Sequence, residues 1–123
     1  LTSSAHQYDR DVKITSFKGQ VKRLLKKIEQ SRGATRLRGF KLKAINEDIA
    51  LWAEANILHA LSWTQGNLVI DKYLITNISD KALIMNEREF RELNKRVRAV
   101  SIRHHQLEPA QTTVLYTFRS SRS

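Results

Sequence analysis

The chain has 123 residues, of which 41% are hydrophobic and 28% are charged, with a net charge of +10 and no cysteine. This composition is typical of a globular protein, and the length fits one domain. The lack of cysteine excludes disulfides, a CxxC redox pair and a thiolate zinc site. The apolar runs are too short to span a bilayer. Because the chain starts at Leu1 without a basic and then apolar leader, we interpret it as a processed protein or an excised domain.

The positive charge is concentrated in residues 10–43, which contain twelve Lys or Arg and only two acidic residues. Such a stretch is typical of contact with nucleic acid or anionic lipid, and also of a solvated helix face. It has no Gly-rich RNA-binding motif and no zinc ligands. The candidate basic patch consists of Lys22, Arg23, Lys26, Lys27, Arg36 and Arg38.

A helix is predicted over residues 17–31, after a flexible lead-in over residues 1–16. Its apolar residues recur at spacings of three and four, which places them on one helix face. They are Phe17, Val21, Leu24, Leu25 and Ile28. Ser16 is suited to cap the start of the helix, and Gly33 is a natural stop. The lysines and arginines fall on the opposite face.

The segment from Leu37 to Ile45 alternates in polarity, which predicts a half-buried strand with Phe40 and Leu42 pointing inward. Residues 46–56 fit either a helical turn or a loop packed by Trp52.

Five further strands are predicted downstream, separated by turn residues. They cover residues 58–63, 68–77, 81–86, 96–102 and 112–118. The strands over 68–77 and 81–86 are expected to form a hairpin, and Glu87 to Asn94 a short helical turn anchored by Phe90 and Leu93. We therefore predict a mainly β protein, a small antiparallel β-sandwich with one N-terminal amphipathic helix. It is expected to form a single domain over residues 17–119, followed by a tail over residues 120–123.

The candidate chemical groups do not form a recognisable active site. None of the histidines has metal-ligand spacing; they are His6, His59, His104 and His105. Glu87, Glu89 and Glu92 alternate with basic residues, which favours a solvated segment over a catalytic carboxylate pair. A Gly-rich phosphate loop and a serine elbow are both missing. We expect a protein that is not an enzyme and holds no metal or cofactor.

Sheet edges bind additional strands unless they are covered, so a small β domain is suited to bind partners by strand addition. We expect the strands Leu68 to Asn77 and Thr112 to Phe118 to supply such edges. The candidate partner-binding residues on them are Leu68, Ile70, Val114 and Tyr116. Aromatic residues are candidate anchors for partners, although most large aromatic side chains belong to the core. They are Trp52, Trp63, Tyr73, Phe90 and Tyr116.

Five pieces of the second half occur in a recognisable order. They are Trp63–Leu68, Tyr73–Ser79, Ile84–Phe90, Val97–Ile102 and Leu107–Tyr116. In the order and spacing of these pieces, this chain resembles the C-terminal domain of the TraK family. A helix such as Val21 to Gln30, followed by Arg32-Gly33 and Gly39-Phe40, also precedes the pattern in that family, so the resemblance covers Phe17 to Arg119. Ala110 departs from it where a glycine is common, and Asn94-Lys95 stands where a Pro-Gly pair is common.

The resemblance implies a periplasmic, outer-membrane-associated component of the core complex of an F-type conjugative type IV secretion system in a Gram-negative bacterium. It further implies binding to a TraV-like lipoprotein and a TraB-like core protein in a homo-oligomeric ring, with no direct nucleic acid. We expect five positions to define the fold: Trp63, Tyr73, Asn77, Phe90 and Tyr116. The alternative is a basic nucleic-acid-binding domain that uses residues 10–43.

Overall fold

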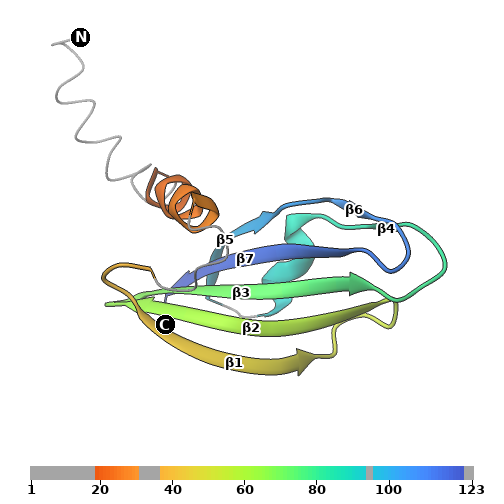
Figure 1. Ribbon diagram of the computed structural model, residues 1–123, viewed down its shortest axis with the longest axis horizontal. Helices are drawn as coiled ribbons and strands as arrows, with labels where there is room; N and C mark the ends of the chain where they lie inside the picture. The colour runs from red at the N-terminus through yellow and green to blue at the C-terminus, as the bar shows by residue number, and fades with distance from the viewer. Residues whose placement is uncertain (1–18, 31–36, 94–95, 121–123) are drawn as a thin grey trace, which may run out of the picture. The chain divides into compact units, whose positions relative to one another are not determined.

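The computed structural model describes residues 19–30, 37–93 and 96–120 of the chain (Figure 1). The chain divides into two compact units, Leu1–Arg36 and Leu37–Ser123. The predicted lead-in over residues 1–16 lies outside the described residues, as do residues 121–123 of the predicted tail. The single domain over residues 17–119 stays a prediction.

The first unit contains a helix over residues 19–30. Val21, Leu24, Leu25 and Ile28 follow one another at intervals of three, one and three residues and so share one face of it. The predicted helix over residues 17–31 is therefore found, with its three outermost residues lying outside the described ranges. In the part of the chain that the structure describes, no helix combines the length and the apolar character needed to cross a membrane.

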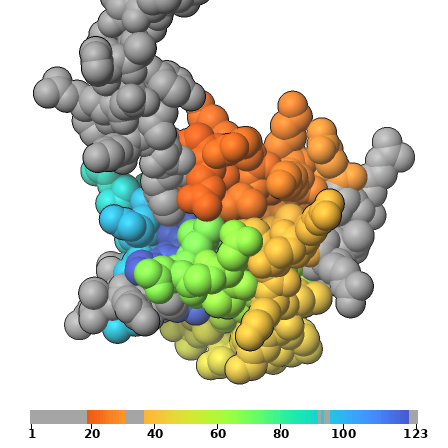
Figure 2. Space-filling model, turned by 90° about the vertical axis from the view of Figure 1, so that its left-hand side faces the viewer, coloured from red at the N-terminus to blue at the C-terminus, as the bar shows by residue number. Residues whose placement is uncertain are grey.

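The second unit is built on a five-stranded antiparallel sheet with the order β1-β2-β3-β7-β5 (Figure 1). Its strands are β1 (Lys41–Ile49), β2 (Ala55–Gln65), β3 (Leu68–Asn77), β5 (Val97–Ile102) and β7 (Thr112–Ser120). A smaller layer is formed by a two-stranded sheet and a 3-10 helix: β4 (Leu83–Ile84), β6 (Gln106–Leu107) and η1 (Glu87–Leu93). The mainly β fold with one N-terminal helix is confirmed. The turn between β2 and β3, green in Figure 2, lies at the surface.

The main core lies between one face of the large sheet and the small layer. Alternate residues of the central strands point toward it, as the period of two requires. The sheet and the small layer both contribute to one buried apolar cluster: Ala55, Ile57, Tyr73, Ile75, Met85, Phe90, Ile102, Leu107 and Leu115. Phe90 of η1 is 0% exposed, and the ring of Trp52 packs edge-on against it with the centroids 5.0 Å apart. The predicted helical turn anchored by Phe90 is thus found as η1.

The predicted hairpin between residues 68–77 and 81–86 is wrong. Only Leu83–Ile84 forms a strand there, and it pairs with β6 rather than with β3. The side chain of Asn77 explains the departure, because its Nδ2 donates hydrogen bonds to the backbone oxygens of Lys81 and Leu107. These bonds direct the chain out of the large sheet and into the small layer.

The first predicted strand also differs from the structure, since β1 begins at Lys41 instead of Leu37. The Phe40 N–H donates to the Leu37 carbonyl across a turn in which Gly39 adopts a φ of 84°. Leu42 is 41% exposed, so the expectation that it points inward is wrong, whereas Phe40 precedes the strand and is half-buried. Since β1 is an edge strand, fewer neighbouring residues cover its side chains.

Candidate interaction site

The two edges of the large sheet are β1 and β5. The expectation that Leu68 to Asn77 and Thr112 to Phe118 supply free edges is wrong. Their strands, β3 and β7, are both inner strands, with β3 between β2 and β7, and β7 between β3 and β5. The backbone groups of β3 and β7 already pair on both sides. The many β-branched and aromatic residues in these two strands favour such an inner position.

The four candidate partner-binding residues lie on one face of the sheet. In the β3–β7 register Lys72 is opposite Tyr116 and Leu74 is opposite Val114, so alternation puts Leu68 and Ile70 on the same face as these two residues of β7. Ile70 is 0% exposed and is not accessible to a partner, whereas the other three are half-buried. Their part in binding stays a prediction.

The edge strand β1 is the most exposed strand of the sheet. Seven of its nine residues are exposed, and its pairing in the described part of the chain is with β2 alone. A bulge interrupts the register between Ala44 and Glu47, and Asn46 there adopts a φ of 53°. Bulges and lysines are the usual devices by which edge strands avoid indiscriminate pairing. Among the described residues, the outer side of β1 therefore has no strand paired with it and carries features that limit indiscriminate pairing.

The opposite edge strand, β5, is shorter and better covered. It has six residues, of which only Arg98 is exposed, and its register with β7 is broken between Val97 and Ala99. Its inward residues Val100 and Ile102 belong to the cluster that includes η1. Of the two edges, β1 offers the longer accessible backbone.

A cavity of about 370 Å³ lies at the end of the β1–β2 hairpin. Two parts of the chain line it: the continuous stretch from the end of β1 through the connecting loop to the start of β2, and the residue that follows β3. The lining consists of Asp48, Ile49, Ala50, Trp52, Ala53, Ala55, Asn56, Ile57 and Ile78. Ile78 is 54% exposed. The backbone holds this residue in place, because its N–H donates to the carbonyl of Glu54.

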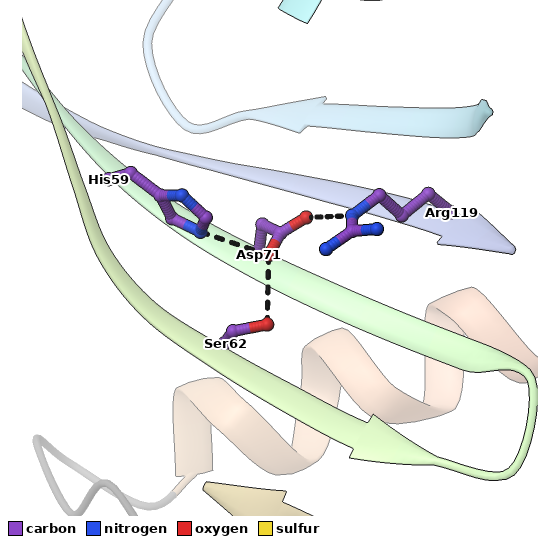
Figure 3. Close-up of polar contacts among 4 residues, drawn as sticks. All are labelled: His59, Ser62, Asp71 and Arg119. Carbon is purple, nitrogen blue, oxygen red and sulfur yellow. Dashed lines mark hydrogen bonds and ion pairs between the residues drawn. The ribbon is translucent and has the colours of Figure 1, made fainter. Parts of the chain in front are cut away.

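A buried polar cluster joins three adjacent strands around Asp71, which is 1% exposed (Figure 3). The carboxylate accepts hydrogen bonds from His59 Nε2 and Ser62 Oγ at Oδ1, both at 2.9 Å, and from Arg119 Nε at Oδ2, at 2.6 Å. Arg119 supplies the counter-charge that a buried carboxylate requires. The cluster therefore links β2, β3 and β7 through one side chain.

The arrangement of this cluster differs from that of a nucleophilic triad. Ser62 and His59 both donate to the same oxygen of Asp71, whereas in a triad the histidine accepts the proton of the serine (Figure 3). The His59 ring stacks on Tyr73, with the centroids 4.5 Å apart. Burial, followed by the charge of Asp71, raises the pKa of Tyr73 to about 12, so its hydroxyl stays protonated. These contacts make the cluster a fastening between strands.

Most of the five positions expected to define the fold have little exposure. Trp63, Tyr73, Asn77 and Phe90 are 5% exposed or less, while Tyr116 is half-buried and its ring centroid lies 6.3 Å from that of Trp63. Asn77 has the most specific role, because its Oδ1 also accepts bonds from the N–H and the hydroxyl of Ser79. It thus connects the end of β3 to the turn and to β6.

His104 and His105 contact separate groups, and His6 lies outside the described residues. His105 Nε2 lies 2.6 Å from Glu87 Oε2, and this contact, the largest of several causes, lowers the pKa of Glu87. His104 Nδ1 instead lies 3.2 Å from the hydroxyl of Thr113. Glu89 accepts a bond from Asn86 Nδ2. In the described ranges, no group of three His, Cys, Asp or Glu side chains is placed to hold a metal ion.

The candidate basic patch is divided between the two units. Four of its members are exposed on the helix: Lys22, Arg23, Lys26 and Lys27. Arg38 is exposed in the turn before β1, and Arg36 lies outside the described residues. On the helix, Lys22 and Lys26, and likewise Arg23 and Lys27, are four residues apart and thus about 6 Å apart along the axis. The basic side chains form two short parallel rows.

Sequence reasoning missed the Asp71 cluster and the cavity. A signal for the first exists, since Asp71 shares the inward alternation of Val69, Tyr73 and Ile75 on a strand rich in apolar residues. A charged residue in that register requires a partner on a neighbouring strand. The cavity has no comparable signal, because it forms where the loop between β1 and β2 meets Ile78, a residue from another part of the chain.

The comparisons with known proteins agree with this fold. The family model described as the TraK C-terminal domain matches residues 15–119, which is most of the chain. None of the curated proteins compared with the chain matches it.

Proposed function

We propose that the chain, which belongs to the TraK C-terminal domain family, is a non-enzymatic structural part of the outer-membrane core complex of a conjugative type IV secretion system. Family membership makes it a component of a Gram-negative conjugation system. In the proposed role it lies in the periplasm at the outer membrane. There it binds a TraV-like lipoprotein and a TraB-like core protein, and neighbouring copies form a ring that surrounds the transfer channel.

The observation that carries this proposal is the open edge of the sheet at β1. Its nine residues are mostly exposed, and in the described part of the chain it pairs on one side alone. Strand addition at such an edge gives affinity through main-chain hydrogen bonds and specificity through alternate side chains. The buried polar groups support the same role, because Asp71 and Asn77 fasten the fold rather than facing an open cleft.

The test is to express the chain with and without the TraV-like lipoprotein of its own conjugation system and to fractionate the membranes. The chain should sediment with the outer membrane only when the lipoprotein is present, and it should co-purify with the lipoprotein at a fixed ratio. Deletion of the chain should abolish mating, and expression in trans should restore it. A chain that stays monomeric and never co-purifies with either core-complex partner would refute the proposal.

The basic face of the helix favours a second candidate, binding to nucleic acid. The two rows formed by Lys22, Arg23, Lys26 and Lys27 are exposed and suited to phosphate contacts. Such binding releases counterions, so the affinity for a DNA duplex should fall steeply between 50 and 200 mM salt. A gel-shift series over that range, with the four residues changed to glutamine as the control, tests it. Weak binding that is independent of these residues eliminates this candidate.

A further inference from the structure

We propose that the lysine row of the helix, Lys22 and Lys26, binds the cavity at the end of the β1–β2 hairpin in a second copy of the chain. This inference rests on the proposed function, because it names the surfaces through which neighbouring copies contact each other. The lysines pair with carboxylates beside the cavity, and Leu25 packs against its apolar wall. The two surfaces are different, so the contact is head to tail and every copy uses both.

The cavity combines apolar walls with an acidic surrounding, at the end of the sheet where the β1–β2 loop meets the end of β3 (Figure 1). Its volume of about 370 Å³ suits a single aliphatic side chain. The stretches of chain around it, residues 47–57 and 76–80, contain four acidic residues and no lysine or arginine. The four are Glu47, Asp48, Glu54 and Asp80, which are all exposed, and none of them forms an ion pair with another described residue. An occupant that is both apolar and positively charged fits this site.

Two of the carboxylates belong to the cavity itself. Asp48 is one of the lining residues, and Glu54 stands between Ala53 and Ala55, which both line it. The backbone of Glu54 is fixed at this place, because its carbonyl accepts a hydrogen bond from the N–H of Ile78, another lining residue. Asp48 and Glu54 are therefore the groups that meet the incoming positive charges.

The helix over residues 19–30 presents the matching pattern. Lys22 and Lys26 are exposed and four residues apart, so they are neighbours on the helix surface. Leu25 follows Lys22 by three residues and is half-buried, which places a partly accessible aliphatic side chain beside the lysine row. Arg23 and Lys27 are each two residues from Leu25, and residues two apart do not face each other. The lysine row is thus the part of the basic face that combines charge with an apolar side chain.

The charge distribution of the chain points to a second copy as the occupant. Residues 10–43 contain twelve basic and two acidic residues, whereas residues 44–123 contain ten basic and nine acidic residues. Copies with a net charge of +10 repel each other in most orientations, but attraction selects the orientation in which the basic region of one copy approaches the acidic cavity of the next. Each contact leaves one cavity and one helix free, so association continues until a ring closes.

The test is sedimentation velocity of the full chain, treated with nuclease, over a range of protein concentrations. The mass of the wild type should rise with concentration beyond that of a dimer, and the association constant should fall at least tenfold between about 50 and about 500 mM salt. The variants K22E/K26E and D48K/E54K should each weaken self-association at least tenfold. The matched control R23E/K27E makes the same charge change on the same helix and should stay within threefold of wild type.

Mixing the two site variants gives a result that unfolding cannot imitate. K22E/K26E carries acidic groups at both surfaces and D48K/E54K carries basic groups at both, so each variant alone repels its own copies. An equimolar mixture contains complementary surfaces and should associate as the wild type does. The combined variant, with all four changes, exchanges the two charges, keeps the net charge of the wild type and should associate with itself again. Circular dichroism melts verify that each variant is folded.

The outcomes separate this contact from the proposed function. If the wild type associates while both site variants stay within threefold of it, or if neither the mixture nor the combined variant restores association, the contact is wrong and the proposed function stands. A wild-type chain that is monomeric after nuclease treatment also refutes the contact, and association seen only before that treatment shows bridging by nucleic acid. The proposed function fails only if the chain also never co-purifies with the lipoprotein or the core protein.

Discussion

Replacing Asn77 with alanine tests whether one side chain holds the two layers of the second unit together. Asn77 is 0% exposed and makes four hydrogen bonds: to the carbonyls of Lys81 (2.8 Å) and Leu107 (2.9 Å), and from the N–H (2.9 Å) and hydroxyl (2.7 Å) of Ser79. The bond to Leu107 is buried, so alanine deprives that carbonyl of its donor at a cost of about 1–3 kcal/mol. The other three bonds are partly accessible to water, which replaces them at about 0.5 kcal/mol each. We expect the free energy of unfolding to fall by about 2.5–4.5 kcal/mol.

Urea unfolding followed by tryptophan fluorescence measures this loss. Both tryptophans, Trp52 and Trp63, lie in the second unit, so the signal reports that unit alone. The midpoint should fall with little change in the slope of the transition. The control is Asn56→Ala, at an exposed position of β2, which should stay within about 0.5 kcal/mol of wild type. An Asn77→Ala protein as stable as the control would refute the role assigned to these bonds.

Three further predictions follow from single contacts. Asp71→Asn deprives Arg119 of its counter-charge. Because Arg119 is 23% exposed, we expect the free energy of unfolding to fall by about 2–3 kcal/mol in the same urea assay. An unchanged midpoint would contradict the role of this ion pair. Gly39→Ala should cost about 1–2 kcal/mol in the same assay, since φ is +84° and the added Cβ would lie 2.8 Å from Gln65 Nε2; a midpoint equal to that of wild type would contradict this expectation. His105→Ala should raise the pKa of Glu87 toward its ordinary value in an NMR titration of the carboxyl carbon. Because the pKa is lowered, this contact stabilises the fold at pH values above the unfolded-state pKa of Glu87, and the stabilisation disappears as the pH falls through the folded-state pKa. An equal Glu87 pKa in wild type and His105→Ala would show that the contact does not form.

The strands β3 and β7 could be predicted from the sequence to within two residues, and the inner strand β2 to within three, because their signal is local. Residues 68–77 alternate and are rich in β-branched side chains, and β3 has those bounds. The strand predicted at 112–118 likewise falls within β7. By contrast, β4 and β6 have two residues each, and two residues have no period to detect. Their pairing depends on Asn77, whose hydrogen bonds reach thirty residues along the chain to Leu107.

The position of each strand within the sheet could not be predicted in the same way. The sequence predicts β3 and β7 as strands without giving their neighbours, and their strong β propensity favours an inner position in which both edges are already paired. The weaker, charged pattern of β1 suits an edge, where Lys41 and Lys43 are solvated. Composition identifies which segments form strands, whereas order in the sheet depends on contacts between distant parts of the chain. The candidate site depends on that order.

The distribution of polar groups in the second unit explains how one sheet combines rigidity with an open edge. Asp71 fastens β2, β3 and β7 to one another, and Asn77 fastens the end of β3 to the small layer. In the described part of the chain, the hydrogen-bond partners of these two side chains lie outside β1, which pairs through its backbone with β2 and is exposed along most of its length. A partner strand that adds at β1 meets a preformed template, so little of the binding free energy is spent on ordering the sheet. Loss of the Asp71 cluster should therefore lower the stability of the unit more than its affinity for a partner, while changes on β1 should do the reverse.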